Sequence, residues 1–339
     1  MATFSAWQAV RQGDPADAIQ LKTDLPIPTT IPRGHVLVKV TAAALNPIGY
    51  KLLQFLPNFI ARRPHTMEQD FAGIITDANG SPDFQTGDRV FGTARNSALA
   101  EYAVIEASQI GKLPPNISAV EAAGLATVVF TSVNALRYLR VEKGQTVFIN
   151  GGSSGVGWSA IQLAKAKGCR VVATASGKNK QFLLDLGVDE FIDYTEAPLA
   201  ELLVSNPPSP PFHAIFDAVG LTDPALYLNS PAYLVPGGGY MTAGTIPHGR
   251  AEWLGMLRQV AGALLPSWLG GVPRRYWGAS YKINQEDMDE VYGLLANGSL
   301  KSIVDSVYEF DREGVMRAYE RQMSKRAVGK VVVKVSEEP

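Results

Sequence analysis

The chain has 339 residues, a length typical of two domains, and 46% of them are hydrophobic. Its 31 Lys and Arg nearly balance its 32 Asp and Glu, which excludes both an acidic disordered protein and a basic nucleic-acid surface. The single cysteine excludes an internal disulfide and a thiolate zinc cluster.

Two further signals are missing from the sequence. The first residues, "MATFSAWQAV", lack the basic and apolar regions of a secretory signal. No run reaches the ~18 apolar residues of a membrane span. We therefore expect a cytoplasmic protein with no transmembrane span and no nucleic-acid partner.

The first 120 residues predict short strands separated by turns. One strand is expected at 35–45, after a Pro-Arg-Gly turn, and another at 71–78, before Asn-Gly. Further strands follow a Gly-Asp turn at 87–88. This spacing predicts an all-β barrel or small sandwich.

From about residue 119 strands alternate with helices. Strands are expected at 146–150, 170–176, 190–194 and 214–220, with helices between them. Nearly continuous apolar strands that alternate with helices predict a parallel sheet covered on both faces. Two helices and a last strand at 329–335 follow, and we expect this strand to rejoin the first domain.

The segment 251–278, with three tryptophans, is unusually apolar. A pair of core-packing helices, a substrate pocket, a subunit interface and a membrane surface all remain open for it.

The turn "GGSSGVG" (151–157) lies between a predicted strand and a predicted helix. Main-chain N–H groups and the positive end of the helix then face one point, which is a site for a pyrophosphate. The pattern departs from G-x-G-x-x-G because Ser154 holds the middle place, but the strand–turn–helix–strand context is the required one.

The same turn matches G-x-S-x-G, the nucleophile elbow of serine hydrolases. In this remote alternative Ser153 would be the nucleophile, with partners such as Asp217 and His248. Four glycines among seven residues favour close approach of the backbone to phosphate instead.

The second strand of this domain predicts which dinucleotide binds. NAD sites usually carry Asp or Glu at its end. Here Ser176, Lys178 and Lys180 offer a hydroxyl and two ammonium groups to a 2′-phosphate, which favours NADPH. Solvated lysines at a helix start are the alternative. Tyr194 could contact the adenosine end or pack at the sheet edge.

Motifs along nearly the whole chain resemble the medium-chain dehydrogenase/reductase family, in its zinc-free branch of quinone oxidoreductases and enoyl reductases. They include "LNPIGYK" (45–51), "QDFAGII" (69–75), "GDRVFG" (87–92), "LATVVFTSVNAL" (125–136), "GGSSGVGWSAIQLAKAKG" (151–168) and "RAVGKVVVKV" (326–335). The resemblance implies an α/β chain: a GroES-like β-barrel catalytic domain (1–124 and 283–339) split around a doubly wound Rossmann domain (125–282), with the active site between them. Relatives of this kind often dimerise through the last Rossmann strand, near residues 276–280, but monomers also occur, so a homodimer is one of two open states.

The resemblance also implies which residues bind the cofactor. One group surrounds the pyrophosphate, a second the 2′-phosphate, and a third the nicotinamide side together with the C-terminal element. In that order they are Gly152, Ser153, Ser154, Gly155 and Val156; Ser176, Lys180 and Tyr194; and Thr131, Gly244, Arg326 and Lys330.

Zinc-dependent relatives hold catalytic zinc with a cysteine where this chain has Asn46 and a histidine where it has Gln69. Neither replacement is a good zinc ligand, so we expect no metal. Relatives often read N-P-x-D-x-K, and this chain has Gly49 in the place of the Asp, so a carboxylate from that position is absent.

Without a metal, NADPH can reduce a carbon activated by conjugation: an enone, an enal, an enoyl group or a quinone. The developing negative oxygen needs a donor, for which Asn46, Tyr50 and Lys51 are candidates, Lys51 first because of its charge. A structural ion pair is the alternative role for Lys51. The expected substrate is small and hydrophobic. An NADP-dependent alcohol or ketone oxidoreductase and a catalytically silent nucleotide-binding protein are the alternatives.

Overall fold

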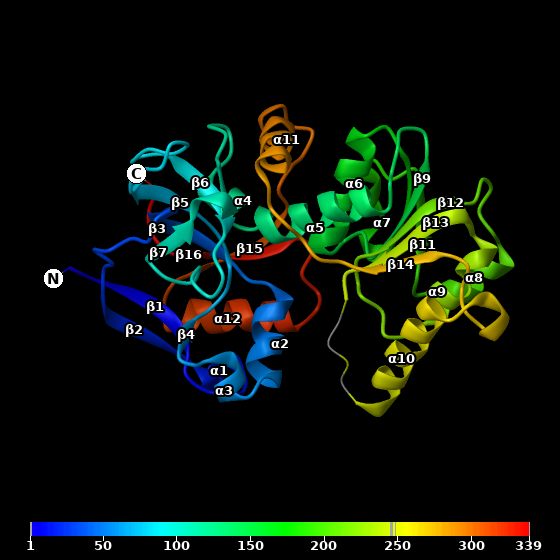
Figure 1. Ribbon diagram of the computed structural model, residues 1–339, viewed down its shortest axis with the longest axis horizontal. Helices are drawn as coiled ribbons and strands as arrows, with labels where there is room; N and C mark the ends of the chain where they lie inside the picture. Colours follow the sequence, from blue (N-terminus) through cyan, green and yellow to red (C-terminus); the bar gives the residue numbers. More distant parts are fainter. Residues whose placement is uncertain (1, 245–246, 248, 339) are drawn as a thin grey trace. The chain divides into compact units, whose positions relative to one another are not determined.

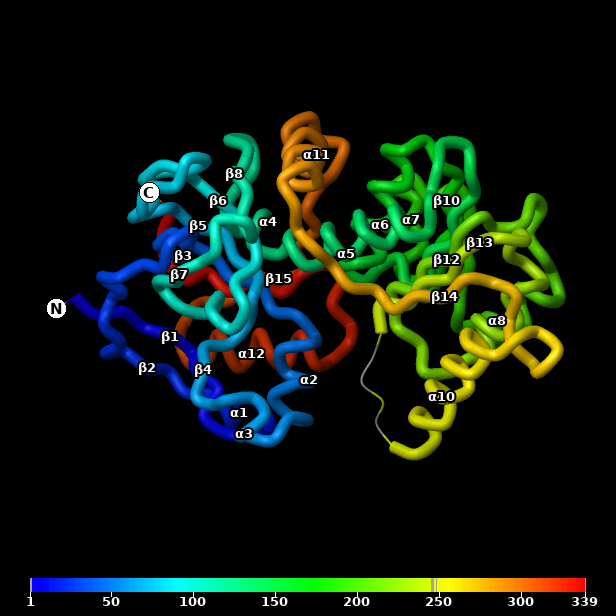
Figure 2. The backbone as a smooth tube through the Cα atoms, in the orientation of Figure 1, coloured from blue at the N-terminus to red at the C-terminus, as the bar shows by residue number. Residues whose placement is uncertain are grey.

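The computed structural model describes residues 2–244, 247 and 249–338. The chain divides into two units: unit 1 comprises Met1–Val128 with Ile283–Pro339, and unit 2 comprises Val129–Lys282 (Figure 1). In Figure 2 the C-terminal segment, coloured red, returns among the blue N-terminal strands of unit 1.

Unit 2 is built on a parallel sheet of six strands. They are β9 (Thr146–Asn150), β10 (Arg170–Ala175), β11 (Glu190–Asp193), β12 (Phe212–Asp217), β13 (Leu234–Thr242) and β14 (Arg275–Gly278). Their order, β11-β10-β9-β12-β13-β14, is that of a doubly wound sheet, and every neighbouring pair is parallel. The predicted Rossmann fold is confirmed.

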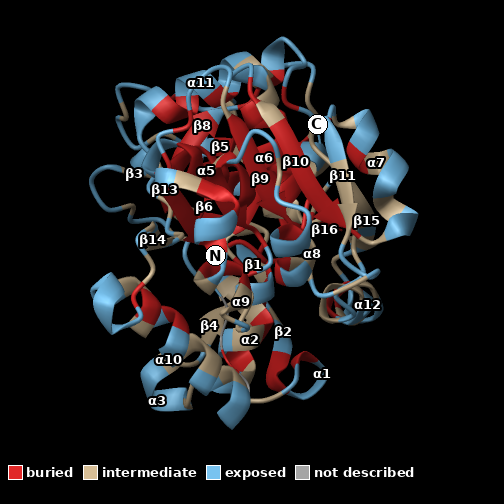
Figure 3. Cartoon of the chain, turned by 90° about the vertical axis from the view of Figure 1, so that its right-hand side faces the viewer, coloured by how far each residue is buried: buried red, intermediate tan, exposed pale blue. Residues whose placement is uncertain are grey.

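The helices of unit 2 follow the strands in alternation. They are α6 (Gly155–Ala166), α7 (Lys180–Asp185), α8 (Leu199–Ser205), α9 (Ala225–Leu228) and α10 (Arg250–Leu264), with short 3₁₀ turns η2 (Gly177–Asn179), η3 (Ser230–Ala232) and η4 (Ser267–Leu269). α6 packs on β9 and β10. All five residues of β9 are buried, which explains its continuous apolar sequence (Figure 3).

The apolar segment of unit 2 exposes much of its length. α10 buries only Gln259 and Gly262, whereas Leu264 is 79% and Trp268 is 80% exposed. No helix among the described residues is both long and apolar enough to span a membrane.

Unit 1 contains two sheets. The larger has the order β15-β16-β3-β5-β6-β8, with β7 also paired to β3, and the smaller has the order β2-β1-β4. The strands are β1 (Thr3–Ala9), β2 (Ile19–Pro26), β3 (His35–Ala44), β4 (His65–Thr66), β5 (Asp70–Asp77), β6 (Arg89–Thr93), β7 (Tyr102–Glu106), β8 (Ile110–Lys112), β15 (Val304–Glu309) and β16 (Lys330–Lys334). This is the predicted GroES-like unit, rejoined by the last strand of the chain.

The helices of unit 1 cover its sheets around a core that includes Trp7, Phe71 and Tyr319. They are α1 (Pro15–Ala18), α2 (Pro47–Phe55), α3 (Asn58–Ala61), η1 (Ala107–Gln109), α4 (Ala119–Ala123), α11 (Gln285–Ala296) and α12 (Arg312–Met323); α5 (Leu125–Tyr138) continues across the division between the units. A capping box of Ser118 and Glu121 starts α4.

Strand register brings three distant segments together in unit 1. β3 pairs antiparallel with β5, with Ala44 opposite Asp70, and with β16, with Ala44 opposite Val332. The end of β3, the start of β5 and the start of β16 therefore lie side by side. Asn46 follows β3, Asp70 begins β5 and Lys330 begins β16, so these three side chains meet.

Candidate functional site

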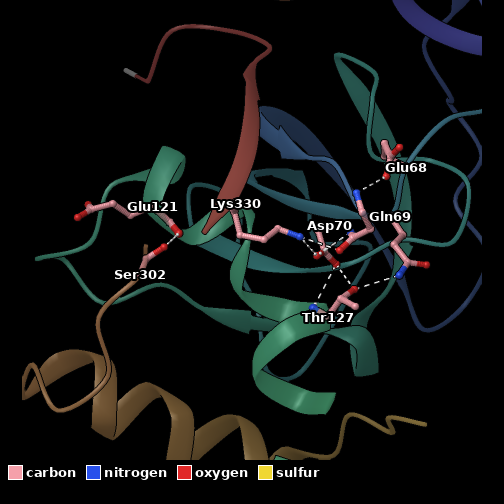
Figure 4. A network of polar contacts seen from close by, with 8 residues as sticks. Glu68, Gln69, Asp70, Glu121, Thr127, Ser302 and Lys330 are labelled. Atoms are coloured by element: carbon pink, nitrogen blue, oxygen red, sulfur yellow. Dashed lines mark hydrogen bonds and ion pairs between the residues drawn. The ribbon is translucent and has the colours of Figure 1, made fainter. Parts of the chain in front are cut away.

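A buried carboxylate, that of Asp70, is the centre of a polar network in unit 1 (Figure 4). Its Oδ2 accepts hydrogen bonds from Asn46 Nδ2 at 3.0 Å and Lys330 Nζ at 3.4 Å. Its Oδ1 accepts from the main-chain N of Thr127 at 3.2 Å and from Thr127 Oγ1 at 2.5 Å. Gln69 Nε2 donates to the same Thr127 hydroxyl at 3.0 Å. The charge of a fully buried carboxylate is thus compensated on both oxygens.

Lys330 supplies the positive charge of this network. Its side chain is only 4% exposed, and its Nζ donates to Asn46 Oδ1 at 2.7 Å as well as to Asp70. Its stem lies against Gly124, where an added Cβ would be 2.8 Å from Lys330 Cβ and 2.7 Å from Cγ. Glycine at 124, between α4 and α5, is therefore what leaves room for the buried lysine.

The orientation of the Asn46 amide is fixed by its partners. An ammonium can only donate, so the carbonyl oxygen faces Lys330, and a carboxylate can only accept, so the amino group faces Asp70. Asn46 also precedes α2 as its N-cap residue, without a side-chain cap of its own. The residue is 3% exposed.

A second carboxyl group, that of Glu68, lies beside the network. Its Oε2 accepts from the main-chain N of Asn46 at 3.0 Å, and its Oε1 accepts from Tyr319 Oη at 2.9 Å. Burial raises the pKa of Glu68 to about 7, an effect that these hydrogen bonds and the charge of Lys330 only partly offset. Glu68 can therefore change its protonation state near neutral pH.

The other two predicted catalytic residues lie on α2. Tyr50 is 7% exposed and belongs to the apolar core of unit 1; burial raises the pKa of its hydroxyl. Lys51 is half-buried. Of Asn46, Tyr50 and Lys51, the lysine is the most exposed.

The predicted phosphate turn of unit 2 has a geometry that fits a pyrophosphate. Ser154 caps α6: its Oγ accepts from the main-chain N of Gly157 at 3.0 Å. A Cβ on Gly157 would be 2.1 Å from the carbonyl oxygen of Gly151, so only glycine lets the helix start this close to the strand end. The first residues of the helix, Gly155 and Val156, are half-exposed, and their amides have no acceptor within an α-helix. Such a helix start fits an anion.

The residues predicted at the 2′-phosphate lie at the ends of β10 and β11. Ser176 follows β10 and is half-buried, Lys178 and Lys180 are exposed, and Tyr194 is 51% exposed. Lys180 Nζ lies 5.9 Å from the centroid of the Phe191 ring. A carboxylate is also near.

That carboxylate belongs to Asp193. Its Oδ1 accepts from the main-chain N of Thr195 at 2.9 Å and from Thr195 Oγ1 at 2.6 Å, and its Oδ2 would be 2.5 Å from a Cβ on Gly177. The hydroxyl and main-chain bonds from Thr195 hold the pKa of Asp193 below its ordinary value. Sequence spacing does not indicate this negative charge beside Gly177, the residue after Ser176.

Asp217, proposed as a triad member in the hydrolase alternative, is fully buried at the end of β12. It accepts main-chain bonds from Gly220 at 3.2 Å and Leu221 at 2.7 Å, and a side-chain bond from Asn150 at 2.8 Å. Burial raises its pKa. These bonds tie the carboxyl ends of the strands together. Its proposed partner His248 lies outside the described residues.

Three more predicted cofactor residues differ in their surroundings. Thr131 is buried within α5. Gly244 is exposed, with φ of 75°, and its oxygen would be 2.4 Å from a Cβ on Gly220. Arg326 is exposed in unit 1, where its carbonyl accepts from Arg321. Their cofactor contacts stay predictions.

Two family models match the chain: an alcohol dehydrogenase GroES-like domain over residues 32–115 and a zinc-binding dehydrogenase over 186–333. Together with the two folds and the phosphate turn, they define a dehydrogenase/reductase of the medium-chain type. The chain belongs to the medium-chain dehydrogenase/reductase superfamily. It is a reductase, and its cofactor is a nicotinamide nucleotide.

Individual relatives cover nearly the whole chain. A trans-enoyl reductase of Aspergillus terreus, pgmF, is 32% identical over 99% of this chain and 97% of its own length. The chloroplastic NADPH-dependent alkenal/one oxidoreductase of Arabidopsis thaliana is 28% identical, over 94% of this chain and 76% of its own. The structure of a quinone oxidoreductase from Coxiella burnetii has a TM-score of 0.80, with 28% identity over 98% of this chain and 100% of that one.

The residues at the two zinc-ligand places do not fit a zinc ion. Asn46 and Gln69 are neutral amides, and both are hydrogen-bonded into the network around Asp70. The ammonium of Lys330, 2.7 Å from Asn46 Oδ1, would repel a divalent cation there. Among the described residues, no group of three or more His, Cys, Asp or Glu is placed to share a metal ion.

Proposed function

We propose that this protein is a zinc-independent, NADPH-dependent reductase of activated carbon–carbon double bonds, in an enone, enal or enoyl group, or of quinones. The observation that carries the proposal is the buried ammonium of Lys330, bound by Asn46 and Asp70 beside the places of the zinc ligands. Because the ammonium of Lys330 already balances the carboxylate of Asp70, this site needs no metal ion for its charge balance. A metal ion that acts as a Lewis acid matters more for an alcohol or ketone substrate than for a substrate with a conjugated double bond.

The relatives support the substrate class. The names of the Aspergillus and Arabidopsis proteins specify enoyl and alkenal or enone substrates, and that of the Coxiella protein specifies quinones. All these acceptors have a double bond polarised by a conjugated carbonyl group. The enzyme's substrate is accordingly a small hydrophobic molecule of this kind.

When bound, NADPH supplies the hydride. The residues of the chain would hold and orient it: the amides of Gly155 and Val156 at the pyrophosphate, with Gly152, Ser153 and Ser154 forming the rest of the turn. The preference for NADPH rests on Ser176, Lys178 and Lys180, which follow β10 without a carboxylate among them. The nearby Asp193 opposes this preference electrostatically, so the test must include NADH.

Lys51 is the proposed donor to the oxygen that becomes negative during reduction. It is more exposed than Asn46 and Tyr50, and its charge offsets an enolate directly. Lys330, in contrast, acts inside the buried network rather than at the cofactor in this proposal. The variant Lys51→Ala should lower turnover of an enone while NADPH affinity stays nearly unchanged. The exposed Lys39 of β3 is a matched control.

The experiment combines the purified protein and NADPH or NADH with a panel of enones, enals, quinones and saturated ketones, and follows loss of the absorbance of the reduced nicotinamide. We expect turnover with the conjugated acceptors and with NADPH over NADH. Turnover of saturated ketones alone would favour an alcohol or ketone oxidoreductase, and binding without any turnover would favour a silent nucleotide-binding protein. The homodimer and the cytoplasmic location also stay proposals.

A further inference from the structure

The carboxyl group of Glu68 occupies the space in which a side chain at position 49 would lie. A Cβ on Gly49 would be 2.3 Å from Glu68 Oε1 and 2.9 Å from Oε2. No side chain at position 49 can coexist with the present place of Glu68. Position 49 is also where related chains often have an Asp. A carboxyl group therefore lies at this place, and it comes from the segment between β4 and β5.

Glu68 has this place despite two unfavourable features. Its φ is 60°, in the left-handed region that favours glycine, and its side chain is only 5% exposed. A long acidic side chain is a poor choice for a buried left-handed position on stability grounds alone. Such strain points to a requirement for the carboxyl group itself.

The contacts of Glu68 indicate what the group does. Oε2 accepts from the main-chain N of Asn46, at the positive end of α2, and Oε1 accepts from Tyr319 of α12. A carboxylate at a helix N-terminus stabilises the start of the helix. The start of α2 fixes both the Asn46 amide, which is bound to Lys330, and the direction of the helix that carries Lys51.

We infer that Glu68 supplies the carboxyl group missing at position 49 and is a positioning residue, which holds Asn46 and the start of α2 for the reaction. The role in turnover rests on the proposed reductase function. The exchange between the two positions does not, because it follows from the space that they share.

The test is a reciprocal exchange in the full-length protein, with Gly49→Asp, Glu68→Gly and the double variant compared with the wild type. Gly49→Asp places its side chain against Glu68, and Glu68→Gly removes the group. The double variant returns a carboxylate from the helix side and puts glycine where φ is positive. We expect each single variant to lower kcat by about 10-fold or more, and the double to return to within about 3-fold of wild type. The NADPH dissociation constant should change less than about 2-fold throughout.

Kinetic effects that simply multiply in the double variant, or a Glu68→Gly variant with wild-type kcat, would overturn the inference. If Gly49→Asp fails to fold, the comparison of Glu68→Gly with the double variant still decides. If the wild type reduces no acceptor, the proposed function fails. The melting temperatures of the same proteins then still test whether positions 49 and 68 compensate each other.

Discussion

The Nζ atom of Lys330 lies 2.7 Å from Oδ1 of Asn46, although the two residues are 284 positions apart in the chain. The antiparallel pairing of β16 with β3 creates this contact. Lys330 is the first residue of β16, and Asn46 lies just after the end of β3. The same ammonium also compensates the carboxylate of Asp70. Both partners are buried, so this small group links the stability of unit 1 to the geometry of its polar site.

Removal of the Lys330 charge should destabilise the protein strongly. Lys330→Met keeps the length of the side chain but leaves Asp70 as an unpaired buried carboxylate, at a cost of about 3–5 kcal/mol. Chemical denaturation measures the loss. The control is Lys334→Met on the same strand, whose ion pair with Glu337 is screened by solvent and should contribute little to stability. Equal losses in the two variants would show that Lys330 is not a buried charge.

Gly124→Ala should destabilise the same network without removing any of its groups. The new Cβ would lie 2.8 Å from Lys330 Cβ, so the lysine or the start of α5 must shift, at a cost of about 1–3 kcal/mol. Gly293→Ala in α11 meets no atom within 4 Å and should instead stabilise by up to about 1 kcal/mol. Thermal unfolding of both variants checks the pair. Stabilisation by Gly124→Ala would contradict the packing described.

The raised pKa of Glu68 predicts a pH dependence of stability. The folded protein binds this proton more tightly than the unfolded chain, with a pKa of about 7 against 4.5. The contribution of this proton to the free energy of unfolding is therefore full below about pH 4.5 and is lost as the pH rises through about 7. The groups that face Glu68 are Tyr319 of α12, Lys330 of β16, Asp70 of β5 and the Asn46 amide.

Unfolding free energies measured between pH 5 and pH 8 should therefore fall more steeply for the wild type than for Glu68→Gln, which cannot ionise. The exposed Glu106 offers the control Glu106→Gln, whose pH profile should match that of the wild type. Parallel profiles for the wild type and Glu68→Gln would contradict the prediction.

Gly157→Ala should abolish cofactor binding. Its Cβ would be 2.1 Å from the Gly151 oxygen, and the backbone must move away at the point where the amides of the turn converge. We expect at least about a 100-fold rise in the NADPH dissociation constant, equal to about 2.7 kcal/mol. Gly278→Ala, which meets no atom within 4 Å, is the control. Calorimetry that finds unchanged affinity for Gly157→Ala would remove this turn from the cofactor site.

The sequence alone predicts the parts of the fold that have local signals. The apolar strand 146–150, the glycine turn and the following helix read directly as one βα unit, because each step depends on neighbouring residues. The return of the last strand to unit 1 was predicted too. The exposure of α10 could not be predicted, because an apolar sequence does not reveal whether the helix packs against the same chain or against another molecule.

The polar network of unit 1 has no comparable local signal. The sequence does not indicate that Asp70 and Thr127 lie beside Lys330, because only the register of β3, β5 and β16 places them together. Glu68 likewise has no sequence signal of its own. The absence of the usual Asp at Gly49 was visible, but the carboxyl group that fills the space comes from another strand end.

The most direct test of the whole account is the turnover of a conjugated enone by the protein and NADPH after removal of bound metals with a chelator. We predict that the metal-stripped protein oxidises NADPH at the rate of the untreated one and that added zinc does not increase this rate. Loss of turnover on stripping, with recovery on addition of zinc, would contradict the account.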